Sequence, residues 1–288
     1  MAAKRKVQKV SPADCALYER VTVDELIDIA AGRIAVHEKG GLVMGNASLY
    51  DENGIDGLSG DPITEAIDLL KNGYAKGRDS MVEMAAEVDK VDEIDNIAIG
   101  LDVAGYRPDV PLYLTGEPAC MQIATEERRK PLVKIVAAAC YSASIDADEV
   151  FHYGVGLASL VQAYERAGYS TEVIACFCSV ASDNEKLFNR LDVELKAAGQ
   201  RLDIDRLAFV FCHESMLRRL KFAWLEMEEP TSDYVDAGDY GCSCSPADGD
   251  ICIPSLHDSK ESRAATKSVA ASVSYFRKLA AAQTAAKG

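Results

Sequence analysis

The sequence predicts an α/β fold in which helices flank a mainly parallel sheet, preceded by a mostly helical N-terminal region. After Lys130, short apolar runs of strand length alternate with amphipathic segments, a pattern typical of parallel strands joined by right-handed crossovers. Before that point, apolar residues recur at helical spacing between glycine-rich loops. We divide the chain into a helical region at 1–125 with an irregular cap at 94–125, an α/β domain at 126–260, and a C-terminal helix with a frayed tail at 261–288.

The first two expected helices carry start and stop signals. Thr22 and Glu25 have the spacing of a capping box, so a helix is expected to begin there and to end near Gly32. In "GDPITEAIDLLKNGY", Pro62 suits the first helical position and Gly73 suits the exit. Both segments therefore support the helical character of the N-terminal region.

The rest of this region holds a third helix and a turn-rich segment. The helix is expected at 79–91, over "DSMVEMAAEVDKV". Residues 94–120 include three prolines and three glycines, so they form either a linker or an irregular cap across the next domain. The apolar residues of this segment indicate that it packs against another part of the chain: Val103, Val110, Leu112, Tyr113 and Leu114.

Strands and helices are expected in turn from residue 130 onward. The run "LVKIVAAAC" suits a strand that is covered on both faces. Glycines at 168 and 199 suit the ends of two helices. In chain order we expect strands at 132–140, 170–180 and 206–213, helices at 146–168, 183–199 and 215–227, edge strands within 242–245 and 250–256, and a final helix at 259–283.

Composition narrows the class of protein. The net charge of −15 opposes non-specific binding to nucleic acid, because phosphates are repelled at long range. No apolar run approaches the roughly 20 residues that span a bilayer. The start "MAAKRKVQKV" is basic without the apolar segment of a secretion signal, so a cytoplasmic location is expected.

Nine cysteines are expected to be free thiols, because a chain of this length in a reducing compartment needs no disulfide framework. The expected strands end at Cys140, at Cys176 and Cys178, and at Cys212 followed by His213. Ligands of open parallel sheets bind at such strand ends, so these groups could form a zinc site or a nucleophile pair. We favour the alternative that they are small apolar residues of the sheet.

Two further sets of residues have alternative interpretations. The types of Cys242, Cys244, Cys252 and His257 suit zinc, yet "CSCS" and "DICIP" both have the pattern of strands. The cations of the helix at 215–227 could hold an anion or a partner's carboxylates, but a solvated helix face is favoured: Arg218, Arg219 and Lys221. Neither a phosphate-binding loop nor a G-x-G-x-x-G fingerprint occurs.

The turn "CYSASID" after the first buried strand resembles that of von Willebrand factor A-type domains, notably the chelatase-associated branch. Those domains hold magnesium with an Asp-x-Ser-x-Ser turn, and the ion grips a partner's carboxylate. Ser142 and Ser144 fall on the two serine positions, whereas Cys140 stands where the aspartate should be. A hard cation prefers oxygen ligands, so the resemblance implies a degenerate site with no metal and no cofactor.

A second resemblance extends over about 200 residues, to a family of tailed-bacteriophage proteins without an established activity. Three segments carry it: "GLSGDPITEAIDLLKNGYAKG", "DVAGYRPDVPLYLTGEPACM" and "ESMLRRLKFAWLE". The resemblance implies a phage origin but no reaction. The matching residues are Asp102, Gly105, Pro108, Val110, Pro111, Gly116, Pro118, Met121, Arg218, Arg219 and Glu226.

Taken together, these features lead us to expect a non-enzymatic phage accessory protein of the host cytoplasm that acts by protein–protein binding. A ring-shaped ATPase is a candidate partner by analogy with related domains. The alternatives are a transcription or replication cofactor that binds single-stranded DNA, and a metal-dependent enzyme. The expected binding face is the end of the sheet with Ser142, Ser144, Asp146, His213, Arg218 and Arg219.

Overall fold

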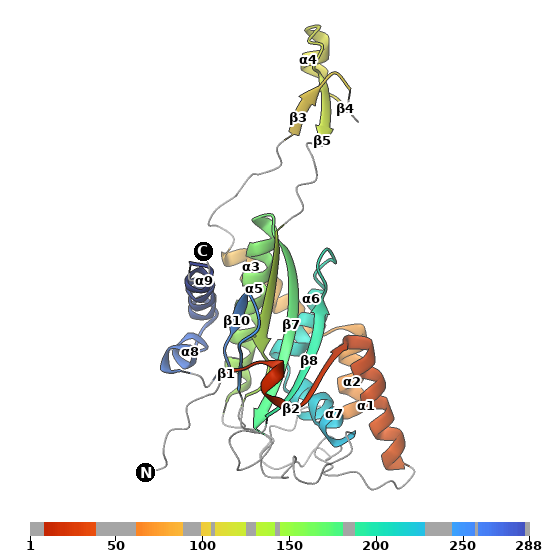
Figure 1. Ribbon diagram of the computed structural model, residues 1–288, viewed down its shortest axis with the longest axis vertical. Helices are drawn as coiled ribbons and strands as arrows, with labels where there is room; N and C mark the ends of the chain where they lie inside the picture. Colours follow the sequence, from red (N-terminus) through yellow and green to blue (C-terminus); the bar gives the residue numbers. More distant parts are fainter. Residues whose placement is uncertain are drawn as a thin grey trace.

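A five-stranded sheet lies at the centre of the protein, and helices cover one of its faces (Figure 1). We refer to this face as the helix side and to the opposite one as the second face. The computed structural model describes residues 9–38, 62–88, 99–104, 107–124, 131–141, 145–180, 188–227, 244–256 and 259–285.

The strands of the central sheet follow the order β10-β6-β7-β8-β2. All neighbouring pairs are parallel except β7 and β8, which run antiparallel. The expectation of a mainly parallel sheet flanked by helices is therefore confirmed. The strands are β2 (Cys15–Thr22), β6 (Leu132–Ala138), β7 (Ser170–Val180), β8 (Phe188–Lys196) and β10 (Ile251–Ile253).

Helix α5 (Ala147–Arg166) connects β6 to β7, as the sequence predicts. The strands pair with Ile135 opposite Val173, and both side chains are completely buried on the helix side. Because successive side chains of a strand alternate between faces, Val136 belongs to the second face. Gly168 follows α5 with φ 85°, a left-handed conformation that glycine adopts at no steric cost.

The helices of the helix side bury one continuous apolar core with the sheet. Its largest members include Leu26, Leu70, Phe209 and Trp224, all fully buried. None of the described helices is long and apolar enough to cross a membrane. The helical segments besides α5 are α1 (Val23–Glu38), α2 (Ile63–Asn72), α3 (Ala75–Val88), α6 (Ile204–Cys212), the π-helical η4 (Met216–Lys221), α7 (Phe222–Met227), α8 (Lys260–Ala265) and α9 (Val269–Ala285).

The N-terminal region supplies a strand as well as helices. Strand β2 pairs with β8 along the edge of the central sheet, which the expectation of a mostly helical region did not include. The capping box of α1 is confirmed, because the Thr22 amide donates to Glu25 and the Glu25 amide donates to Thr22. Helix α1 continues past Gly32. Pro62 is the N-cap residue of α2, so this helix begins at Ile63, one residue later than expected.

Two elements of the α/β half are the reverse of the prediction. Residues 188–196 form strand β8, where a helix was expected. Leu191, Val193 and Leu195 alternate there with charged residues, which is the period of a strand. Residues 204–212 form helix α6, where a strand was expected, because Asp203 caps it by accepting a hydrogen bond from the Arg206 amide.

Two short segments cover part of the second face: β1 (Lys9–Val10) with η1 (Pro12–Asp14), and β9 (Ser245–Pro246). β1 and β9 pair in parallel. Val10 and Cys244 pack there against Ile174, Cys176 and Cys178 of the sheet. This small second core fixes the chain before β2 onto the sheet.

The described residues of 99–104 and 107–124 form a separate antiparallel sheet, labelled β3, β4 and β5 in Figure 1, together with one short helix. The expectation that its apolar residues pack against the chain is wrong for Val103, Val110, Tyr113 and Leu114, each of which is more than half exposed. The elements are β3 (Ile99–Asp102), β4 (Arg107–Pro108), α4 (Val110–Leu114) and β5 (Met121–Ala124).

Candidate functional site

Polar and charged side chains meet at the end of the sheet where β6 and β7 finish. Cys140 and Tyr141 lie two and three residues after the end of β6, and Ser179 lies one residue before the end of β7. Arg218 and Lys221 reach this place from η4. We call these five residues the sheet-end cluster. A π-helical turn is rare and often occurs at functional sites.

Lys221 is the most unusual member of the sheet-end cluster, because its side chain is 0% exposed. Its Nζ donates a hydrogen bond to Ser179 Oγ at 3.2 Å and lies 5.4 Å from the centre of the Phe222 ring. Among the described residues, Lys221 forms no ion pair with a carboxylate. Burial lowers the pKa of Lys221, and the positive charge of Arg218 adds to this effect.

Cys140 and Tyr141 supply buried groups beside these cations. Burial raises the pKa of the Cys140 thiol to about 11, although Lys221 and Arg218 oppose the shift. Burial also raises the pKa of Tyr141, and the nearby Glu214 carboxylate adds to that rise. The Tyr141 hydroxyl is buried without a hydrogen-bond partner among the described residues.

Arg218 and Arg219 do not form the solvated helix face that the sequence favoured. Arg219 is 1% exposed, and Arg218 is partly buried with its Cζ 5.8 Å from the centre of the Phe222 ring. Arg218 Nε is buried and has no hydrogen-bond partner in the described part of the chain. The sequence offered these cations, Lys221 included, as a possible anion site but favoured a solvated face, and it did not single out Tyr141. Only the apolar residues around Lys221 hinted at its burial.

The donor set of the sheet-end cluster does not fit magnesium. Magnesium requires oxygen ligands in near-octahedral arrangement, whereas Cys140 offers a protonated thiol. Lys221 and Arg218 place two cationic groups beside that thiol, and both repel a divalent cation. We therefore derive no chemistry from a bound metal at this turn.

The other residues expected at the binding face are spread over several elements. Asp146 is exposed and is the N-cap residue of α5, but its side chain makes no capping hydrogen bond. His213 follows α6, accepts a hydrogen bond from the Ser215 amide at 3.2 Å and stacks on Phe209. Ser142 and Ser144 lie outside the described residues.

The cysteines at the expected strand ends are divided between the two faces of the sheet. Cys140 belongs to the helix side, whereas Cys176 and Cys178 belong to the second face. Cys212 ends helix α6, and its thiol lies 3.7 Å from the carbonyl oxygen of Phe151. The eight described cysteines are free thiols, and no group of three or more possible metal ligands occurs among the described residues.

The zinc alternative falls partly outside the described chain, because it includes Cys242 and His257. Of its other two members, Cys244 is buried in the second core. Cys252 is half-buried in β10, and its thiol accepts a hydrogen bond from the Gly249 amide at 3.3 Å. The two described members therefore lie in or beside short strands, as the alternative to a zinc site predicts.

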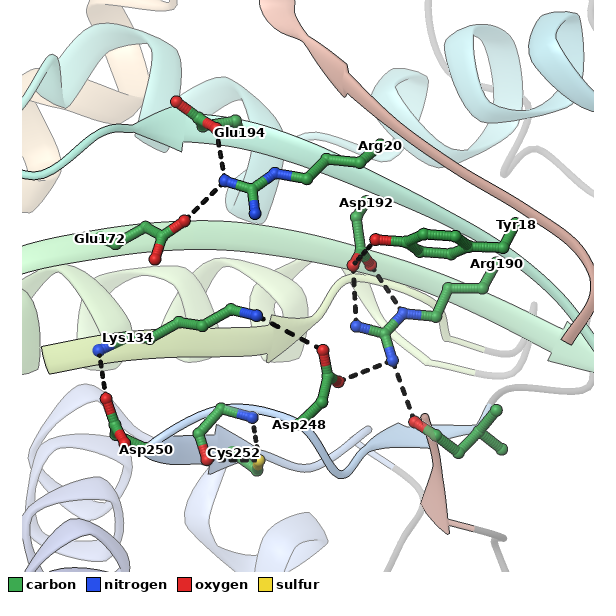
Figure 2. A network of polar contacts seen from close by, with 12 residues as sticks. Tyr18, Arg20, Lys134, Glu172, Arg190, Asp192, Glu194, Asp248, Asp250 and Cys252 are labelled. Atoms are coloured by element: carbon green, nitrogen blue, oxygen red, sulfur yellow. Dashed lines mark hydrogen bonds and ion pairs between the residues drawn. The ribbon is translucent and has the colours of Figure 1, made fainter. Parts of the chain in front are cut away.

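A second charged group, the second-face network, lies on the other side of the sheet (Figure 2). Its centre is Arg190, which is fully buried and pairs with Asp192 at 2.8 Å and with Asp248 at 2.7 Å. Arg190 Nη1 also donates to the carbonyl oxygen of Val10 at 3.0 Å. Arg20 bridges the carboxylates of Glu172 and Glu194, and Lys134 pairs with Asp248.

Each cation of the second-face network has a carboxylate partner, so the network differs from the sheet-end cluster. Arg190 links three segments: β8, β1 through Val10, and the segment after β9 through Asp248. Such a fully paired set of charges fixes the geometry of a fold without leaving donors for a ligand. We assign the second-face network a structural role.

The fold and the sheet-end cluster define an α/β protein with buried donors at one end of its sheet that have no partner among the described residues. Over residues 36–283 the chain matches the family described as Domain of unknown function (DUF7192), and it belongs to that family. No curated protein matches the chain. No solved structure matches it.

Proposed function

We propose that the protein is a non-enzymatic accessory protein that binds another protein with the end of its sheet. The observation that carries this proposal is Lys221, a fully buried ammonium without a described carboxylate partner. Buried polar groups in folded proteins are almost always satisfied, so an unsatisfied set marks a site that something else completes. Beside Lys221, Arg218 Nε and the Tyr141 hydroxyl are buried without a hydrogen-bond partner among the described residues.

The order of elements supports a degenerate von Willebrand A-like domain as the frame of this site. Strand β6, a serine-containing turn, helix α5 and strand β7 follow one another as in the resemblance, and Cys140 occupies the position of the aspartate. On this proposal the turn has lost its ion and serves adhesion. A phage origin, a cytoplasmic location and a ring-shaped ATPase as partner belong to the same proposal and rest on resemblance alone.

The charges of the second face favour a protein partner over single-stranded DNA. Binding of single strands needs a positive groove with exposed aromatic side chains. The described cations of the second face are instead paired with carboxylates, as Arg20 and Arg190 are. Fluorescence polarisation with a single-stranded oligonucleotide at low and moderate salt separates the two candidates, since a steep salt slope would favour DNA.

Site-specific photo-crosslinking tests the proposal. A photoreactive amino acid replaces Asp146, which is exposed beside the sheet-end turn, and in a matched control it replaces Lys278, which is exposed on α9. In the cells that make the protein we expect one crosslinked partner from position 146 and none from position 278. Equal crosslinking from both positions, or none from either, would contradict binding at the end of the sheet.

A further inference from the structure

We propose that Lys221, Arg218 and Tyr141 bind a single carboxylate, the side chain of an aspartate or glutamate of the partner. This inference rests on the proposed function and deepens it by naming the chemical group that the sheet-end cluster recognises. It makes the cluster an anion site, the alternative that the sequence offered for Arg218 and Lys221, where the resemblance implied a degenerate cation site.

The contrast between two buried lysines points to a missing anion. Lys196 is 1% exposed, and its Nζ lies 2.8 Å from the Glu165 carboxylate and donates to the Thr171 carbonyl oxygen at 2.7 Å. Lys221 is equally buried, yet its only described hydrogen bond goes to the neutral Ser179 hydroxyl. An ammonium without a counter-charge is costly to bury, so Lys221 is the position that an added anion would stabilise most.

The number of free donors suits a carboxylate. The Lys221 ammonium has three N–H groups, of which one is used by Ser179. Arg218 Nε and the Tyr141 hydroxyl are buried and have no acceptor in the part of the chain that the structure describes. Two carboxylate oxygens offer about four acceptor positions, which matches this set.

The local charge favours a singly charged anion. Lys221 and Arg218 are cationic, and the Glu214 carboxylate beside Tyr141 offsets one of the two positive charges. A net charge near +1 matches a carboxylate, whereas a doubly charged phosphate would remain uncompensated in a buried site. Arg218 is only partly buried, so the site reaches the surface at this residue.

Side-chain NMR of the full chain with ¹³C,¹⁵N-labelled lysine tests the site directly. Sodium acetate is titrated at constant ionic strength and neutral pH, and the Lys221→Met variant assigns the Lys221 signal. We expect a saturable shift of Lys221 and none of Lys196, which already has a carboxylate partner in the same sample. No saturable shift with acetate, or a stronger response to inorganic phosphate or to magnesium chloride, would overturn the inference.

Two variants of Cys140 give an independent readout. Cys140→Asp places a carboxylate of the chain itself beside Lys221, so we expect the acetate response to disappear. Cys140→Ser is the matched neutral variant and should retain the response. An unchanged acetate response in Cys140→Asp, in a protein shown to be folded by circular dichroism, would contradict the site.

The crosslinked partner separates this inference from the proposed function. We expect Lys221→Met to weaken partner binding by about thirtyfold or more, the effect of removing one member of a buried charge pair. Lys278→Met, on exposed α9, should bind normally. A partner held equally by both variants would refute the carboxylate and leave the proposed function standing. If acetate binds but no crosslinked partner is found, the carboxylate site stands and the proposed function is refuted.

Discussion

Arg33 Nε lies 3.1 Å from Glu226 Oε2, and both side chains are at most 1% exposed, so an ion pair joins α1 to α7 inside the core. Residues 193 positions apart in the chain are thereby held together inside the core. The pair explains why a charged residue can stand within the otherwise apolar face of each helix, since a buried charge requires a partner.

Removing one member of this pair should be strongly destabilising. We expect Glu226→Leu to lower the free energy of unfolding by about 3–5 kcal/mol, because the Arg33 charge stays buried without its partner. The double variant Arg33→Met with Glu226→Leu should recover most of that loss. Urea denaturation of the wild type, the two single variants and the double variant measures the coupling energy between the two side chains. If the losses in the free energy of unfolding of the single variants simply add in the double variant, the ion pair is contradicted.

Replacing Lys221 by methionine should stabilise the protein at neutral pH, because it removes a buried charge that has no carboxylate partner among the described residues. Because burial lowers the pKa of Lys221, the unfolded chain keeps the lysine proton up to its usual pKa of 10.5, whereas the folded chain releases it earlier. The stability of the wild type therefore rises toward that of Lys221→Met as the pH increases through this window. Denaturation at several pH values, in a buffer without small carboxylates, measures the difference in stability between the two proteins. A difference that grows as the pH rises would contradict a lowered pKa of Lys221.

Cys140 should make the protein less stable as the pH rises, whereas Lys221 makes it more stable. Its folded-state pKa is about 11, above the usual 9.0, so the stability that the neutral thiol provides is lost as the pH rises between these values. Relative to Cys140→Ala, we expect the wild type to lose about 2 kcal/mol between about pH 8 and about pH 11. Denaturation curves of both proteins at the two pH values provide the comparison. A difference in stability that stays the same at both pH values would mean that the thiol is exposed to solvent.

Gly154 should not tolerate a side chain. A Cβ atom there would lie 2.3 Å from Cys212 Sγ and 2.8 Å from the carbonyl oxygen of Phe211, where α5 and α6 pack closely. We expect Gly154→Ala to destabilise the protein by about 1–3 kcal/mol. Adding Cys212→Ala should recover only part of this, because the backbone contact remains. Thermal unfolding checks both variants, with Ser274→Ala on the exposed face of α9 as the control.

Most of the order of buried strands and amphipathic helices could be derived from the sequence. For β8 and α6 the predicted type was wrong, because a helix was expected at β8 and a strand at α6. The segment "FNRLDVELK" is rich in helix-forming charged residues, yet its alternation places Arg190 and Asp192 on the second face and Val193 on the helix side. The run "LAFVFC" is apolar throughout, and short apolar runs do not distinguish a buried helix from a buried strand. Asp203 was the available signal, as the capping residue of α6.

The candidate site was only partly predictable for a related reason. The strand-end rule points to the finish of β6 and β7, where Cys140 and Ser179 lie. The sequence favoured a solvated position for Lys221 because a charged residue is usually solvated, and only the packed environment of η4 reveals that it is completely buried.

Strand β2 has a practical consequence for anyone who wishes to express the α/β half by itself. Glu19 accepts a hydrogen bond from Trp224 on one side of the sheet, and Arg20 reaches Glu172 and Glu194 on the other. A fragment starting near residue 126 would lack both contacts. Its strand β8 would become an edge strand with unpaired backbone N–H and C=O groups, which favours self-association. Expression plasmids for this protein should therefore start no later than residue 9.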